Sequence, residues 1–153
     1  MTSRAILGRI GGFGVLSRGN WMRFIAVLLF VVTGTFAKAD LPAPLEYIPG
    51  LKKERFSNGE TLLVKFKTDW SMTSARQEEL LTELMTENPS YVEKLTFITV
   101  DYDTFGKSRM AERLMVTRNG TLLIMRDNTV VERLEASIDK RELKALLDAV
   151  ERP

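Results

Sequence analysis

A tryptophan followed by a cluster of hydroxyl side chains is the first candidate for chemistry in this chain. The segment reads Trp70-Ser71-Met72-Thr73-Ser74 and precedes a stretch with helical periodicity. At the start of a helix, hydroxyl groups and unpaired backbone amides can bind an anion or a peptide carboxylate. Serine and threonine there can instead serve only to cap the helix. Both roles are open for this segment.

Most familiar catalytic groups are missing. None of the 153 residues is a cysteine or a histidine, which excludes thiolate chemistry and the Ser–His–Asp triad. Ser71 could act as a nucleophile only with Lys65 as its base, so a cysteine-free, Ser71-dependent enzyme is the alternative function class. Asp101 and Asp103, with Glu93, are typical of solvated carboxylates rather than of a cation site. We therefore expect no metal and no cofactor.

The first 39 residues resemble a secretory signal peptide. Four arginines and no acidic residue precede or flank the apolar run 24–36, and Ala37-Lys38-Ala39 supplies a small-x-small cleavage site before Asp40. A start at Met22 would also produce a compact signal peptide. The alternative is an uncleaved anchor, although a bilayer span takes about 20 apolar residues. The pattern predicts export, to a periplasmic or secreted location.

The charge of the chain divides unevenly between leader and remainder. The leader holds five of the 22 basic residues and none of the 20 acidic ones, so residues 40–153 carry a net charge of −3. The basic character of the whole chain therefore comes from the leader. It gives no argument for nucleic-acid binding.

The remaining residues predict one α/β domain, over 51–153, after an extended lead-in over 40–50 that contains three of the five prolines. Apolar periodicity predicts the secondary structure. Helices are expected over 51–56, 75–88, 107–114 and 139–150, and strands over 61–67, 95–100, 121–125 and 129–134. This order predicts a mixed central sheet of about four to five strands with helices on both faces.

Local signals refine the ends of these elements. Ser74 with Gln77, and Asp139 with Glu142, have the spacing of capping boxes at two helix starts. The dipeptide at 119–120 is Asn-Gly, which is also the strongest short hairpin signal. Residues 114–117 could therefore pair directly with the strand over 121–125, as an alternative to the mixed sheet.

The element order and the segment 64–74 resemble the thioredoxin family, over roughly residues 51–150. In thioredoxins the first central strand leads into a tryptophan and then Cys-x-x-Cys at the start of a long helix. Trp70 is in place, while Ser71 and Ser74 stand where the two cysteines would be. The resemblance implies a thioredoxin-like fold that lacks the Cys-x-x-Cys cysteines.

Two further departures accompany the missing cysteines. Gly120 replaces the cis-proline that faces the thioredoxin active site, and Lys65 replaces the buried acidic residue of the first central strand. Without a thiol, dithiol–disulfide exchange is impossible. The resemblance therefore implies a redox-inactive domain that acts as a protein-binding, peptide-binding or accessory module.

The resemblance also implies where a partner would bind. Trp70 would be a contact residue on the groove face, or else be partly buried against the sheet edge. The expected peptide-binding residues are Trp70, Ser71, Met72, Thr73, Ser74, Asn119, Gly120 and Thr121. The expected partner is a protein or peptide, and not a nucleic acid, with the chain itself a monomer. Membrane contact would come only through an uncleaved leader, which would make the chain a tethered accessory protein.

Overall fold

The computed structural model describes residues 41–152. The predicted signal peptide, its predicted cleavage site and the possible start at Met22 lie outside the described residues. Within them, no helix is both long enough and apolar enough to cross a membrane.

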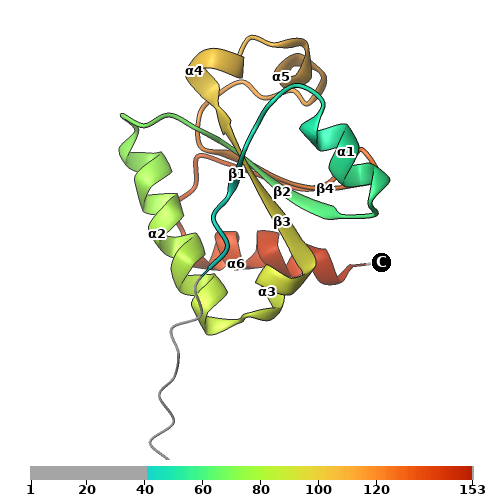
Figure 1. The fold of residues 1–153 in the computed structure, drawn as a ribbon. Coiled ribbons are helices and arrows are strands. Elements are labelled where there is room, and N and C mark those ends of the chain that lie inside the picture. The colour runs from blue at the N-terminus through green and yellow to red at the C-terminus, as the bar shows by residue number, and fades with distance from the viewer. Residues whose placement is uncertain (1–40, 153) are drawn as a thin grey trace, which may run out of the picture. The chain divides into compact units, whose positions relative to one another are not determined.

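A five-stranded mixed sheet forms the centre of the domain (Figure 1). Its strands are β1 (Leu45–Glu46), β2 (Thr61–Lys67), β3 (Leu95–Asp101), β4 (Thr121–Arg126) and β5 (Thr129–Glu135). They lie in the order β1-β3-β2-β4-β5. Strand β3 runs parallel to both β1 and β2, whereas β4 is antiparallel to β2 and to β5. The sheet is therefore mixed, as the element order predicts.

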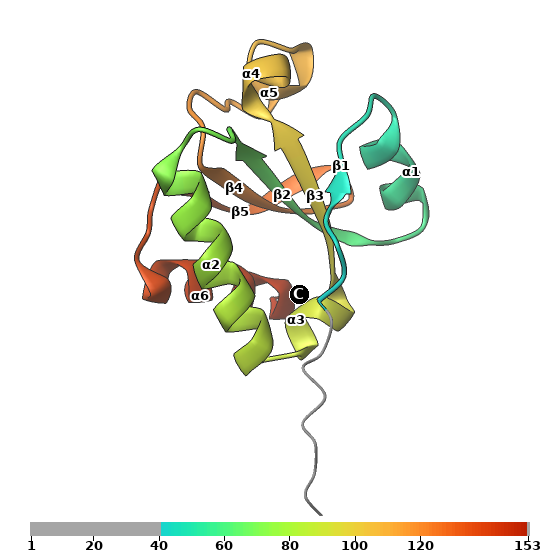
Figure 2. The same ribbon diagram turned by 60° about the vertical axis from the view of Figure 1, so that its left-hand side comes forward.

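Helices cover both faces of this sheet (Figures 1 and 2). One face carries α2 (Met72–Glu87), α3 (Ser90–Lys94) and α6 (Lys140–Asp148), which a short 3₁₀ helix (Ala149–Glu151) extends. The other face carries α1 (Leu51–Ser57), α4 (Tyr102–Phe105) and α5 (Arg109–Arg113).

Strand β2 shows why the strand sequences are almost continuously apolar. Its side chains alternate between the two faces. Leu62, Val64 and Phe66 belong to the core under α1 and α5, while Leu63 belongs to the core under α2 and α6. Lys65 follows Leu63 onto the α2 face. Because helices cover both faces, the strand is apolar on both sides, and Lys65 is the residue that interrupts the apolar run between Leu62 and Phe66.

The structure corrects several expectations. Residues 114–117 do not pair with β4, because β2 and β5 occupy both of its edges. Ser74 does not cap α2: the cap is Ser71, one helical turn nearer the N-terminus. The lead-in contains the two-residue strand β1, and the acidic segment after β3 begins α4; neither element was expected. At α6 Asp139 is the cap, since its side chain accepts a hydrogen bond from the amide of Arg141, but the predicted capping box is incomplete: the Asp139 amide donates to the Ser137 hydroxyl and not to Glu142.

Candidate functional site

The two serines at the cysteine positions are buried and serve the start of α2. The Ser71 hydroxyl oxygen accepts a hydrogen bond from the Ser74 amide at 3.2 Å, which is N-cap geometry. The Ser74 hydroxyl oxygen accepts one from the Thr68 amide at 3.4 Å and so ties the end of β2 to the helix. Their hydroxyl groups are thus engaged in holding the β2–α2 connection.

The two large side chains of this segment point the other way, into solvent. Trp70 is 74% exposed and Met72 is 87% exposed. The Trp70 indole N–H donates to the Asp103 carboxylate of α4 at 2.9 Å, which restrains the ring although it is not buried. The structure thus leaves Trp70 available for contact instead of packing it against the sheet edge.

The loop before β4 lies beside the start of α2. The Asn119 side-chain amide donates to the Thr68 hydroxyl at 3.0 Å. A β-carbon added at Gly120 would lie 3.3 Å from the Thr73 Cγ2 methyl. These contacts bring residues 68–73 and 119–120 together, as the resemblance implies. Thr121, by contrast, is fully buried and bonds back to the Arg118 carbonyl, so it supports the loop from beneath.

Gly120 uses both of its backbone polar groups within the chain. Its amide donates to the Phe66 carbonyl at 2.7 Å. Its carbonyl accepts from the Ala136 amide at 2.9 Å and from the Gln77 side chain at 2.9 Å. Gly120 has φ +75° and Ala136 has φ 52°, so both residues of this contact are in the left-handed region. Glycine adopts this conformation freely, whereas at Ala136 it is strained and persists only where surrounding contacts hold it.

Gln77 is a buried residue whose role the sequence did not reveal. Its side-chain amide donates to the carbonyls of Gly120 and Ser137, and it links α2 to two loops that are far apart in sequence. Its spacing from Ser74 suggested a capping box instead. The one available signal was a polar side chain on the same helical stripe as Leu80, Leu81 and Leu84.

Lys65 is 7% exposed and lies behind the start of α2. Its ammonium donates to the Ser74 carbonyl at 3.3 Å and to Glu78 Oε2 at 3.1 Å. Burial lowers the pKa of Lys65, and the hydrogen bond and charge of Glu78 offset part of that shift. Both hydrogen bonds of the ammonium go to these groups, so the side chain is not placed as a base for the Ser71 hydroxyl.

The acidic residues near Trp70 have local protein partners. Asp101 accepts hydrogen bonds from Thr104 and from the Asp103 amide and caps α4; these bonds, the Thr104 one foremost, lower the pKa of Asp101. Asp103 accepts from Trp70. Between residues 41 and 152 there is no group of three or more Asp, Glu, His or Cys side chains that could hold a metal ion.

Comparison with known proteins gives the class of the fold. Trxlp of Edwardsiella tarda superposes with a TM-score of 0.58 and 24% identity, over 67% of this chain and 97% of that one. Oxidised thioredoxin of Plasmodium falciparum gives 0.56 and 21%, over 69% and 96%, and a poplar thioredoxin h mutant gives 0.56 and 21%, over 73% and 87%. No protein-family model matches the sequence. No curated protein sequence matches it either.

The fold is therefore that of the thioredoxins, as the resemblance implied. With no cysteine in the sequence, the chain is a thioredoxin-like domain without the Cys-x-x-Cys motif. A thioredoxin fold that lacks both thiols fits a redox-inactive domain, because a serine hydroxyl cannot form a mixed disulfide.

Proposed function

We propose that this chain is an exported, redox-inactive thioredoxin-like domain that binds a protein or peptide. The binding surface consists of Trp70, Met72, Thr73 and Asn119, and we call it the Trp70 surface. The observation that carries the proposal is the exposure of Trp70 and Met72, at 74% and 87%, beside the loop before β4.

The exposed side chains suit protein recognition. Tryptophan is enriched among the residues that dominate binding energy at protein interfaces, and methionine adapts to partners of varied shape. The hydrogen bond to Asp103 restrains the Trp70 ring before a partner arrives. A restrained side chain loses less conformational entropy on binding, so more of the burial energy contributes to affinity.

The neighbouring loop supplies backbone groups for an extended peptide. Among residues 41–152, the amide and carbonyl of Asn119 make no hydrogen bond with another backbone group, whereas those of Gly120 are both used. The Asn119 side chain is tied to Thr68, which holds this backbone in place. An extended segment of a partner could therefore pair with Asn119 and place its side chains against Trp70 and Met72.

Export is supported by the sequence of the leader. Its basic start, apolar run and small-x-small site favour cleavage between Ala39 and Asp40. The intact mass of the protein recovered from a producing cell tests this point. A mass that begins at Asp40 supports export, and a mass that retains residues 1–39 favours the tethered accessory protein instead.

Site-directed photo-crosslinking tests the binding surface. A benzophenone amino acid at position 72 should crosslink one discrete partner in an envelope fraction. The same group at position 94 is the control, because Lys94 is an exposed residue before β3, at the opposite end of the sheet from Trp70. Equal crosslinking from both positions, or none from position 72, would contradict the proposal.

The contribution of Trp70 is then measured with the partner in hand. Trp70→Ala should weaken capture by about tenfold or more, in the range of an interface residue that dominates binding. Trp70→Phe is the matched control, because it keeps an aromatic surface and removes only the N–H bond to Asp103. It should retain most of the affinity. Unchanged capture by Trp70→Ala would show that the partner binds elsewhere.

A further inference from the structure

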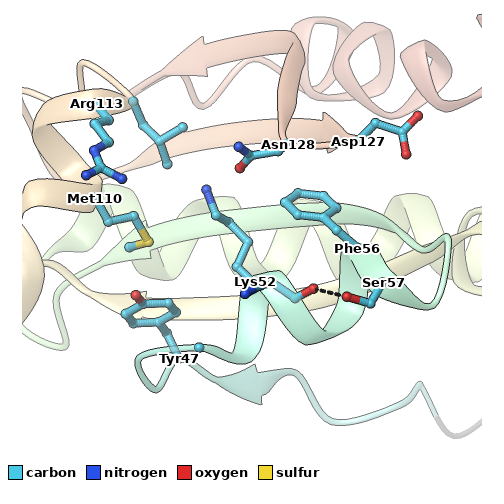
Figure 3. Close-up of a pocket in the computed structure, with 11 residues that line it drawn as sticks. Tyr47, Lys52, Phe56, Ser57, Met110, Arg113, Asp127 and Asn128 are labelled. Carbon is cyan, nitrogen blue, oxygen red and sulfur yellow. Dashed lines mark hydrogen bonds between the residues drawn. The ribbon is translucent and has the colours of Figure 1, made fainter.

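A cavity lies away from the Trp70 surface, between α1, α5 and the turn that joins β4 to β5 (Figure 3). It has a volume of about 750 Å³, within the range of small-molecule sites. Tyr47, Phe56 and Met110 form apolar parts of its wall, and Lys52, Arg113 and Asn128 contribute polar groups. It shares no residue with the Trp70 surface.

The basic residues around this cavity are distinctive because, within residues 41–152, they have no acidic partners. The other basic side chains of residues 41–152 bond to a carboxylate or, at Arg126, to backbone carbonyls. The five that make no such bond within this part of the chain all lie on α1, on α5 or just before α5. They are Lys52, Lys53, Lys107, Arg109 and Arg113.

Three of these five residues, Lys52, Lys53 and Arg113, line the cavity. Figure 3 shows the Lys52 ammonium and the Arg113 guanidinium on the same side of it. Burial lowers the pKa of Lys52, and the charge of Arg113 lowers it further. The one carboxylate of the cavity wall, Asp127, points away from both of them in Figure 3. Within residues 41–152 the positive charges of Lys52 and Arg113 therefore have no carboxylate partner, and a bound anion could accept hydrogen bonds from both.

The walls beside the two cations are suited to an apolar group. The Lys52 ammonium lies 5.8 Å from the centre of the Phe56 ring, which places charge and aromatic surface side by side. Phe105 packs edge-on against Tyr47 with ring centres 5.0 Å apart, and so holds one wall in position. An aromatic or aliphatic group could lie against Tyr47, Phe56 and Met110 while its anionic end reaches the cations.

We propose that this cavity binds an organic anion. A phosphate, sulfonate or carboxylate lies between Lys52 and Arg113, and the aromatic or aliphatic group attached to it lies against Tyr47, Phe56 and Met110. The site is independent of the Trp70 surface, so either proposal can fail without the other.

Methionine methyl NMR tests the proposal, with phenyl phosphate as the probe. In protein labelled with [methyl-¹³C]methionine, phenyl phosphate should shift the Met110 signal, assigned by its loss in Met110→Leu. The exposed Met72 methyl serves as an internal control and should not move. Inorganic phosphate should bind at least about tenfold more weakly than phenyl phosphate, because it lacks the group that contacts the apolar wall.

Variants distinguish a built site from general attraction to positive charge. Lys52→Gln and Arg113→Gln should each weaken phenyl phosphate binding by about tenfold, as expected for loss of a charged hydrogen-bond donor. Lys107→Gln removes an unpaired cation outside the cavity and should leave binding unchanged. Equal losses in all three variants, equal binding of inorganic phosphate, or no Met110 shift at about 10 mM phenyl phosphate would overturn the proposal.

Discussion

Gly120 and Gly59 offer a matched pair for measuring what holds the loop before β4. Their φ angles are +75° and +74°, so a valine at either position meets the same backbone strain. They differ in surroundings. Among residues 41–152, a β-carbon at Gly59 has no atom within 4 Å beyond the glycine and its two chain neighbours, whereas one at Gly120 lies 3.3 Å from the Ala136 Cα and 3.4 Å from Gln77 Oε1. The difference between the two variants therefore isolates the cost of crowding at the loop.

The expected magnitudes follow from these two contributions. Left-handed backbone strain costs a non-glycine residue about 1–3 kcal/mol, and we expect Gly59→Val to lose an amount in that range. At Gly120 the added carbon also presses on backbone, which cannot move aside as a flexible side chain would. Overpacking adds about 1–3 kcal/mol. Gly120→Val should therefore be less stable than Gly59→Val by at least about 1 kcal/mol.

Urea unfolding followed by far-ultraviolet circular dichroism gives the free energy of unfolding of each variant. The slope against urea should be the same in all three proteins, so that the midpoints report stability alone. Equal losses at the two glycines would show that the loop relaxes around the added side chain. No loss at either position would refute the argument from φ.

Three other predictions concern α2 and the residues packed against it. Lys65→Met should raise the free energy of unfolding by about 1–3 kcal/mol at pH 7, because it removes a buried charge, whereas the exposed control Lys107→Met should change it little. Burial lowers the pKa of Lys65 in the folded state, so the folded wild-type protein releases this proton at a lower pH than the unfolded protein does. The stability gain of Lys65→Met should therefore shrink as the pH rises toward 10.5. The double variant Ser71→Cys, Ser74→Cys should form an intramolecular disulfide in a glutathione redox titration followed by mass spectrometry. Its reduction potential should lie above about −270 mV, because the helix start favours the thiolate. If no disulfide forms at any glutathione ratio, the helix-start geometry is wrong. Gln77→Leu should lose about 1–3 kcal/mol in urea unfolding, because the buried Gly120 carbonyl and the partly buried Ser137 carbonyl each lose a donor. An unchanged midpoint would show that water replaces the Gln77 amide.

The position of the candidate site could be predicted from the sequence, but the role of each serine in it could not. The helix-start position of residues 71–74 followed from hydroxyl residues ahead of a helical repeat, and the structure places Ser71 at the cap. Which serine caps the helix was predicted wrongly: the spacing of Ser74 and Gln77 favours Ser74, although Ser71 is equally suited to cap by residue type. The chain path at the end of β2 decides between them, because Thr68 binds the Ser74 hydroxyl.

The sequence by itself determined the four longer strands, the longer helices and the absence of thiol chemistry. Strands buried on both faces need long apolar runs, and such runs can be recognised in the sequence alone, as at 61–67 and 121–125. The absence of cysteine is a fact of composition.

Only the tertiary structure decided which distant residues meet. Strand β1 has two residues, too few for a periodic signal, and it exists because β3 offers it an edge. Gln77 bonds to Gly120, 43 positions away in the sequence, and the cavity joins Lys52 of α1 to Arg113 of α5. Local patterns report the neighbours of a residue along the chain, whereas these contacts depend on how the sheet brings separate segments together.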